Sequence, residues 1–460
     1  MRVLPGGGVM SQENLTMALS TPGARLDEGL VSPPNTTSSR RRAHSRSPGR
    51  LRWPGLAALS LALLAGCAGS TGAAPAKDPA QGAAPEQQEP FDLEKALSRE
   101  AGELPAREIR AGAWSARALA AEAPKIVEKE KLVSVAIPIG TDSHVECFVY
   151  NTMLDSGEVI RQFVELLEPG KVEIARIVPW EISVHRDSPA VFLQALYSVP
   201  TGGGKAAGLL KIAMHADKSH PVACLHDELG YLATFERLAK GIFDSFEAKD
   251  ALPAPEYTET LILRADKMPI GFETNELIKE AGGQRRWFSR STSLLPRDAR
   301  TLEIEDEASN VLLDAQGRIK AGLWVEMAGG KANHRMELSQ KAGSQYEYAG
   351  EVEGKRVQGS FTAPGKSGLA SPVSIASELA RLMKDKGPFD VKQQEYEPGM
   401  DPTKPTEVRY ARDPSGAVTV SFLTMRLTGA LAPDGRPEAF EISAGPPRLT
   451  LQRAHSRGKL

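Results

Sequence analysis

The stretch IKAGLWVEMAGGKANHRMEL, residues 319–338, has the clearest structural signal in the chain. Apolar residues alternate with other types from Ile319 to Met327, a Gly-Gly pair follows at 329–330, and the alternation then resumes. A period of two is typical of strands with one face on a core, and paired glycines are typical of hairpin turns. The stretch therefore predicts an antiparallel hairpin with His334 as a core or cavity histidine and a wet face that carries Lys320, Gly322, Trp324 and Glu326.

The same pattern extends along the chain on both sides of this hairpin. Alternation continues to Phe361, and Ser371-Pro372 is a typical helix start that predicts a helix over 372–385. Further strands are expected between Val408 and Leu451, with a bulge where the apolar parity changes after Phe422. Residues 255–455 thus form a predicted antiparallel β-rich domain with a packed helix.

Residues 129–250 predict a different domain, in which strands are interrupted by helices. Six apolar segments between Leu132 and Leu225 read as strands. One helix is expected after Asp155, and a second carries apolar residues at spacings of three and four from Tyr231 to Phe246, with Asp227 and Glu228 at its start. The predicted fold class is α+β, namely an N-terminal α/β sandwich domain followed by the antiparallel β-rich domain.

Both domains resemble known architectures in outline. The order of strands and helices in 129–250 is similar to that of the PsbP/Mog1-like sandwich family, typified by an extrinsic photosystem protein. A curved sheet with a helix on its apolar side resembles the half-barrels of periplasmic lipoprotein carriers. The second resemblance implies that acyl chains are held between sheet and helix, whereas a plain packed core is the alternative.

Near the N-terminus, Leu64-Ala65-Gly66-Cys67 closes an apolar run that begins at Leu56. The run is about ten residues long, which suits a signal peptide and is shorter than the roughly twenty residues that span a bilayer. The four residues resemble the lipobox of bacterial lipoproteins. The resemblance implies signal-peptidase recognition through Leu64, Ala65 and Gly66, and lipidation of Cys67.

The segments around Cys67 fit this interpretation. Residues 1–66 read as leader and signal peptide, although the leader is long and a start near Leu51 is an alternative. Residues 67–90, rich in Ala, Pro and Gln, predict a disordered tether with a reach of about 25 to 30 Å. Residues 91–128 are expected to form a mixed helical segment. Ala68 after the anchor, rather than Asp, favours the outer membrane by analogy with enteric lipoproteins.

Charge and cysteine content narrow the function classes. The whole chain has a net charge of −2, and the leader holds an excess of arginine, so the part after Cys67 carries −7. A mildly acidic body argues against nucleic-acid binding. The remaining cysteines, Cys147 and Cys224, predict a disulfide in an oxidising compartment, with two free thiols as the alternative.

Two groups of residues are candidate sites. His144, Cys147, His215, His220, Cys224, His226, Asp227 and Glu228 have the chemistry of metal ligands, but strand alternation separates their faces, so no metal and no cofactor is predicted. Arg285, Arg286 and Arg290 flank Trp287 and Phe288 and could bind an anionic lipid or polysaccharide. A solvated strand edge is the alternative for this basic segment.

No catalytic motif is present, so a non-catalytic role is expected. The sequence predicts a lipid-anchored cell-envelope lipoprotein of the outer membrane, facing the periplasm or the surface, with a binding or assembly function. Its expected partners are the membrane, an envelope protein, or a lipid or polysaccharide. The alternatives are a carrier of a hydrophobic ligand in the β-rich domain, and a metal-dependent or hydrolytic enzyme that uses the His/Cys group.

Overall fold

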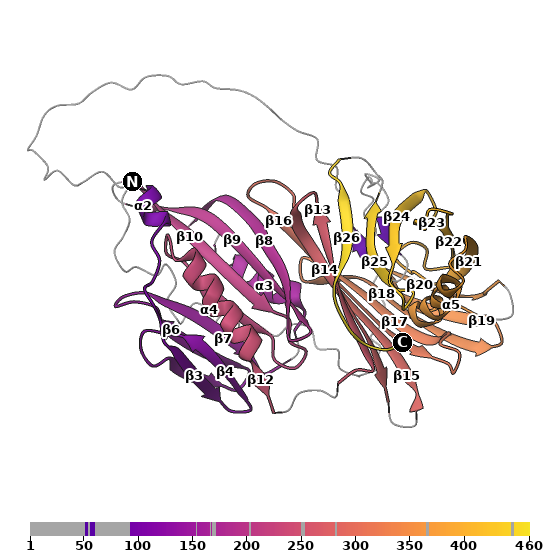
Figure 1. Ribbon diagram of the computed structural model, residues 1–460, viewed down its shortest axis with the longest axis horizontal. Coiled ribbons are helices and arrows are strands. Elements are labelled where there is room, and N and C mark those ends of the chain that lie inside the picture. Colours follow the sequence, from indigo (N-terminus) through magenta and orange to yellow (C-terminus); the bar gives the residue numbers. More distant parts are fainter. Residues whose placement is uncertain are drawn as a thin grey trace, which may run out of the picture.

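The structure is a computed structural model of the chain (Figure 1). It describes the backbone of 51–53 and 56–59 and then residues 93–460, apart from 153, 166, 168–171, 202–203, 250–253, 281–282, 365–367 and 443–445. The first of these stretches form a pair of short strands, β1 (Leu51–Trp53) and β2 (Leu56–Leu59). The residues predicted to form a lipobox, Leu64, Ala65, Gly66 and Cys67, and the expected tether lie outside the described residues.

A seven-stranded antiparallel sheet forms most of the N-terminal half. Its order is β5-β6-β7-β11-β10-β9-β8. The strands are β5 (Lys125–Lys129), β6 (Leu132–Pro138), β7 (His144–Tyr150), β8 (Glu173–His185), β9 (Ser188–Thr201), β10 (Gly204–His215) and β11 (Val222–His226). The strands expected between Leu132 and Leu225 are confirmed.

A helix and a small sheet cover one face of this sheet. The helix is α4 (Leu232–Ser245), and the small sheet has the order β12-β4-β3. Its strands are β3 (Ala106–Ala111), β4 (Trp114–Leu119) and β12 (Glu247–Ala248), and α2 (Leu93–Leu97) precedes them. Phe235, Leu238 and Ile242 of α4 are buried in one apolar cluster together with residues of β3, β4, β6, β7 and β11.

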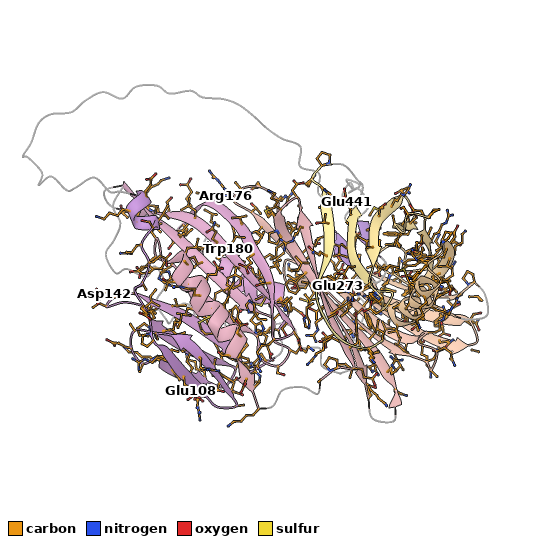
Figure 2. All side chains as sticks on the ribbon, viewed as in Figure 1. Glu108, Asp142, Arg176, Trp180, Glu273 and Glu441 are labelled. Atoms are coloured by element: carbon orange, nitrogen blue, oxygen red, sulfur yellow. A yellow bond between two sulfur atoms is a disulfide. The ribbon has the colours of Figure 1, made fainter. Side chains whose placement is uncertain are left out.

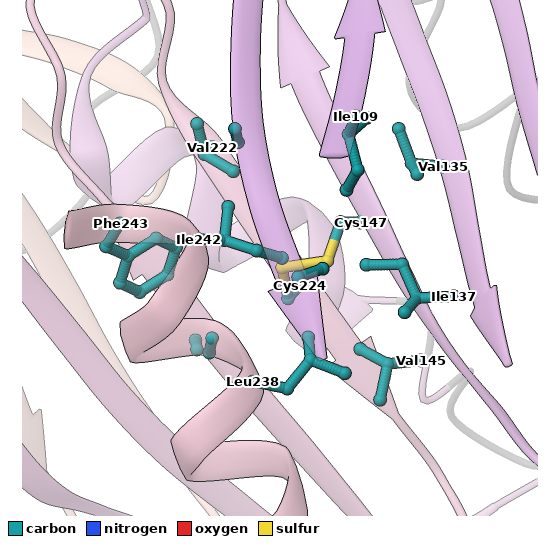
Figure 3. Close-up of a cluster of buried hydrophobic side chains, with 14 of the residues drawn as sticks. Ile109, Val135, Ile137, Val145, Cys147, Val222, Cys224, Leu238, Ile242 and Phe243 are labelled. Atoms are coloured by element: carbon teal, nitrogen blue, oxygen red, sulfur yellow. A yellow bond between two sulfur atoms is a disulfide. The ribbon is translucent and has the colours of Figure 1, made fainter. Parts of the chain in front are cut away.

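Cys147 and Cys224 form a disulfide in the middle of this cluster (Figure 3). The two residues face each other in the register of β7 and β11, and their Cα atoms are 4.0 Å apart. Figure 3 shows the bridge between Ile137 and Val145 on one side and Leu238 of α4 on the other. The predicted pairing is confirmed, and neither sulfur is available as a thiolate.

The C-terminal half is one fourteen-stranded antiparallel sheet that curves around α5 (Pro372–Lys384) (Figure 1). Its order is β20-β19-β18-β17-β16-β15-β14-β13-β26-β25-β24-β23-β22-β21, so that β26 is inserted between β13 and β25. The strands are β13 (Tyr257–Ala265), β14 (Met268–Lys279), β15 (Arg285–Pro296), β16 (Leu302–Leu313), β17 (Ile319–Ala328), β18 (Lys331–Ala342), β19 (Gln345–Val352), β20 (Lys355–Thr362), β21 (Phe389–Glu395), β22 (Thr406–Arg412), β23 (Val418–Phe422), β24 (Met425–Leu431), β25 (Pro437–Ile442) and β26 (Leu449–Gly458).

The two large sheets are joined by a shared core. Ile262, Phe272, Leu294 and Ile304 on the outer face of the long sheet belong to the same apolar cluster as residues of the seven-stranded sheet and of α3 (Ser156–Glu165). Asp187 at the turn between β8 and β9 adds an ion pair of 2.9 Å to His455 of β26. The outer face of β13–β16 is therefore an internal packing surface.

The predicted α+β class is wrong, because the protein is mainly antiparallel β. The N-terminal half is not the expected α/β sandwich: α3 and α4 are its longest helices, with 10 and 14 residues, and they only cover sheets that are built from hairpins. The apolar residues spaced along the chain from Phe235 to Ile242 are a strong signal for a helix. Most of the N-terminal half nevertheless consists of strands. The helices that the structure describes are each too short or too polar to cross a bilayer.

Three local expectations also need correction. Residues 91–128 hold little helix beyond α2, because 106–119 form the hairpin β3–β4. The parity change after Phe422 marks a tight turn rather than a bulge, since Phe422 pairs with Met425 and Leu423 has a φ of 49°. The N-terminus of α4 is capped by a distant carboxylate: the N–H groups of Ala233 and Thr234 donate to Glu100 at 2.9 and 2.7 Å.

Candidate ligand-binding cavity

The inner face of the long sheet carries a polar strip where the half-barrel resemblance implies an apolar one. Register pairs place Glu273 of β14, Ser291 of β15, Glu307 of β16, Glu326 of β17 and His334 of β18 in one row across five strands. Glu273 lies near the centre of the molecule in Figure 2. Side chains in such a row share one face of a sheet. Apolar clusters flank the strip, one around Leu261 and one around Trp287.

A cavity of about 70 Å³ lies over part of this strip. Strands β15 to β18 form one wall, and the opposite wall comes from the start of α5 and the end of β21. The lining residues are Trp287, Ser289, Glu307, Ala308, Ser309, Val311, Ile319, Trp324, Val325, Glu326, His334, Met336, Ala370, Pro372, Glu395, Tyr396, Glu397 and Pro398. The volume equals that of about two water molecules, which limits it to a small group.

Glu326 is the most buried carboxylate on the floor of the cavity, with an exposed fraction of 3%. Its Oε2 lies 3.0 Å from Nδ1 of His334 on the neighbouring strand. On the other side, Glu307 stands directly opposite Glu326 in the register of β16 and β17. Carboxylates in directly opposite positions repel each other. The floor therefore brings two glutamates and a histidine together on one face of the sheet.

Aromatic side chains border the cavity. The rings of Trp324 and Tyr396 meet edge to face, with centroids 5.2 Å apart. Trp287 is 1% exposed, and its Nε1 has no hydrogen-bond partner within the described part of the chain. A buried indole N–H without an acceptor is costly.

A buried network of ionic side chains packs against the ring of Trp287. Arg436 lies over its ring, with the guanidinium carbon 5.0 Å from the ring centroid. Nε of Arg436 donates a 2.8 Å hydrogen bond to Glu259, which also accepts one of 2.9 Å from the hydroxyl of Tyr257. Arg453 binds Asp434 through two hydrogen bonds of 2.9 Å. These contacts hold both arginines in place, and neither of them lines the cavity.

The opposite wall adds a second buried carboxyl group. Glu395 at the end of β21 is 4% exposed and accepts a 2.8 Å hydrogen bond from the hydroxyl of Tyr410. Burial raises the pKa of Glu395 to about 7, although the hydrogen bond from Tyr410 and the charge of Arg436 act in the opposite direction. Glu395 can therefore exchange a proton near neutral pH.

The sequence alone did not identify these residues. Trp324 and Glu326 were expected on a wet face, but a register irregularity between Leu312 and Leu313, where β17 begins to pair, turns them toward the interior. No local pattern predicts that irregularity. A weaker signal was present in β16, where Glu303, Glu305 and Glu307 alternate and thereby mark one face of the strand as acidic.

The structure does not bring the residues of the other predicted sites together. Among the residues that the structure describes, no three His, Cys, Asp or Glu side chains are arranged to hold a metal ion. His226 contacts Ser143, with 3.1 Å between Nε2 and Oγ, and His215 contacts the backbone oxygen of His185 at 3.0 Å. Burial lowers the pKa of His226 to about 2. His215, His220 and His226 are thus buried and take part in internal packing, whereas His144 is exposed.

The arginines near Trp287 are placed on different faces and lie near carboxylates. Arg285 lies 3.4 Å from Glu256, and Arg286 lies 2.5 Å from Glu280. Arg290 faces the N-terminal half, where burial raises the pKa of Asp155 and the charge of Arg290 only partly opposes this. Since β15 is an inner strand of the long sheet, it is not a solvated edge. The three arginines do not form one patch.

The similarity of the chain to known proteins is found among solved structures. No protein-family model and no curated protein matches the chain. Among solved structures, the chain is similar to the crystal structure of a beta-barrel-like protein of domain of unknown function DUF1849 from Brucella abortus. The TM-score is 0.33 at 12% sequence identity, over 44% of this chain and 96% of that one.

Proposed function

We propose that the protein is a lipid-anchored binding protein of the bacterial cell envelope, without catalytic activity, and that its ligand enters the cavity between β15–β18 and α5. The anchor rests on the sequence Leu64-Ala65-Gly66-Cys67. The binding role rests on one observation: Glu307 and Glu326 stand opposite each other on the floor of a cavity with aromatic walls. Polar side chains gathered in this way favour binding over mere packing, because a plain core would be apolar.

The other candidate functions find less support in the geometry. An acyl chain needs an apolar site of about 300 Å³ or more, whereas this cavity encloses about 70 Å³ over a polar floor. Hydrolysis by the Ser143–His226 pair would need a partner that orients the imidazole. Nδ1 of His226 has no hydrogen-bond partner among the described residues.

The anchor is tested by metabolic labelling of the producing bacterium with radioactive palmitate. We expect label in the wild-type protein and none in Cys67→Ser, which should also leave the membrane fraction. Equal labelling of both proteins, or none in either, would remove the anchor from the proposal.

The binding role is tested separately by tryptophan fluorescence, since Trp287 and Trp324 line the cavity. Small polar probes should change the emission in a saturable way. A folded protein that shows no saturable response to probes of any charge would refute the binding role and leave the anchor untouched.

A further inference from the structure

Strand β3 forms the end of the small sheet, whose order is β12-β4-β3. It pairs with β4 along one edge, and no strand in the described part of the chain pairs with its other edge. Glu108 of this strand lies at the lower left margin of the molecule in Figure 2. An edge of this kind offers N–H and C=O groups to a further strand.

The backbone of β3 alternates between the two edges of the strand. The N–H of Ala120, just beyond β4, donates a 3.0 Å hydrogen bond to the C=O of Pro105, just before β3. Because every second residue of an antiparallel strand points its backbone groups to the same edge, those of Arg107 and Ile109 also point toward β4. The N–H and C=O groups of Glu108 and Arg110 therefore point to the outer edge.

The side chains of β3 divide between the core and the solvent. Ile109 is 2% exposed and belongs to the apolar cluster under α4. On the other face, Glu108 and Arg110 form an ion pair of 2.7 Å, with side chains that are 55% and 75% exposed, and Arg117 of β4 stands opposite Glu108. Exposed ion pairs contribute little within one chain, because water screens them. Both charges of β3 are thus accessible to a second strand.

These two charges make the edge complementary to itself. In a two-fold antiparallel pairing of two β3 strands, Ile109 can lie opposite Ile109 of the second copy, which places Glu108 of each copy opposite Arg110 of the other. A shift of the register by two residues places either Glu108 opposite Glu108 or Arg110 opposite Arg110. Opposite charges attract and like charges repel in such positions. The edge therefore favours one register.

Strand β5, at the edge of the seven-stranded sheet, has the contrasting charge pattern. All 5 of its residues are exposed. Pairing of the whole strand with a second copy would centre on Val127 and would place Lys125 opposite Lys129, which is repulsive. Lysines on an edge strand are a common protection against pairing. Strand β3 lacks this protection.

We propose that two copies of the protein associate through their β3 edges, so that their small sheets join into one antiparallel sheet across a two-fold axis at Ile109. Glu108 and Arg110 of each copy exchange backbone hydrogen bonds and ion pairs with Arg110 and Glu108 of the other. This association does not depend on the cavity or on the anchor. A single strand edge buries less than the roughly 1,200 to 2,000 Å² of a standard interface, so the dimer is weak and concentration-dependent.

The first test is analytical ultracentrifugation of the full chain, with Cys67→Ser in every sample to keep the predicted lipidation out of the comparison. We expect an equilibrium that shifts from monomer to dimer with concentration. Glu108→Arg gives the edge two arginines and Arg110→Glu gives it two glutamates, so each variant alone should associate at least about tenfold more weakly. A mixture of the two variants should associate again, because each arginine then lies opposite a glutamate.

Arg107→Glu is the matched control for Arg110→Glu. It makes the same change of charge on the same strand, but the proposed register places Arg107 opposite Ala111 of the second copy. We expect it to leave the association within about twofold of the wild type. The three substituted positions are exposed. The melting temperature of each variant should therefore stay that of the wild type.

Disulfide cross-linking tests the register independently, in the same Cys67→Ser background. When Glu108→Cys and Arg110→Cys proteins are mixed, they should form a mixed disulfide, because directly opposed residues of a hydrogen-bonded pair have Cα atoms about 5.5 Å apart. Each variant alone should cross-link much less, since its two thiols are then two positions out of register.

Several outcomes would overturn the proposal. These are a wild-type chain that stays monomeric up to its solubility limit, a mixture of Glu108→Arg and Arg110→Glu that associates no better than either variant alone, and an equal loss of association in Arg107→Glu and Arg110→Glu. Cross-linking of Glu108→Cys with itself as strongly as with Arg110→Cys would also overturn it, because the two charges would then not lie opposite each other.

Discussion

The backbone N–H of Gly157 donates a hydrogen bond of 2.9 Å to Oδ1 of Asp306, which joins the first turn of α3 to β16. The hydroxyl of Thr292 donates a second hydrogen bond of 2.7 Å to the same oxygen. This contact lies where the two large sheets share their core, so it links the N-terminal half to the wall that also carries Glu307. The two halves are held together at the back of the proposed binding site.

Gly157→Ala should destabilise the protein by about 1 to 3 kcal/mol, because the added methyl group has no room. A Cβ at residue 157 would lie 2.7 Å from both Oδ1 of Asp306 and Cγ2 of Ile304. Urea denaturation measures the change. Gly241→Ala in α4 is the control, since nothing lies within 4 Å of its added Cβ, and it should stabilise by up to about 1 kcal/mol. Equal effects of the two substitutions would contradict the close packing.

Asp306 should make the protein less stable as the pH rises. Burial raises its pKa from 3.8 to about 7, despite the hydrogen bond from Thr292. Between these values the unfolded chain releases the proton and the folded protein keeps it, so stability is lost as pH increases through this window. The loss is on the order of 4 kcal/mol at most. Asp306→Asn keeps the hydrogen bonds and removes this proton.

The measurement for Asp306 is the free energy of unfolding of both proteins between pH 4 and pH 8. Glu395, whose pKa is also raised, contributes in the same direction, but it does so in both proteins and cancels in the difference. The stability of the wild type relative to Asp306→Asn should fall with rising pH. A constant or rising difference would contradict the assignment.

Reduction of the disulfide should destabilise the protein by about 4 kcal/mol, because Cys147 and Cys224 are separated by 77 positions in sequence. Thermal unfolding with and without dithiothreitol measures the effect. The double variant Cys147→Ala, Cys224→Ala is the control and should be insensitive to the reductant. A wild-type melting temperature that does not change after complete reduction would refute this prediction.

Glu259→Gln should cost about 3 to 5 kcal/mol, because it leaves Arg436 buried without its carboxylate. Glu259 has an exposed fraction of 0%, and it accepts hydrogen bonds from Arg436, Tyr257 and Asn275. Glu441→Gln breaks an exposed ion pair with Arg448 and should change stability by no more than about 1 kcal/mol. Denaturant unfolding of both variants tests the difference.

Local sequence patterns correctly predicted the secondary structure of the segments that contain them. The capping box at Ser371 with Pro372 marks the start of α5, and the alternation after Ile319 marks the hairpin β17–β18. These signals are local, since a cap or a period of two depends on residues that are neighbours in the chain. The disulfide was predictable because Cys147 and Cys224 are the pair that remains if Cys67 is the predicted lipidation site.

The structural features that the sequence did not predict depend on contacts between residues that are far apart in the chain. The inward position of Glu326 follows from one register irregularity, and a shift of one residue exchanges the two faces of a strand. The carboxylate that caps α4 is Glu100, more than a hundred residues away from Thr234. Glu395 reaches the cavity only because the long sheet curves around α5. Such contacts are set by topology, which a single sequence does not reveal.

The insertion of β26 between β13 and β25 has a consequence for biogenesis. Among the strands of this sheet, β13 is synthesised first and β26 last. Until β26 has been made, one edge of β13 and one edge of β25 therefore have no partner strand. Pairings over such long loops form slowly, and unpaired edges promote aggregation. A nascent chain that stalls before residue 449 would therefore need a chaperone to shield both edges until the last ladder closes.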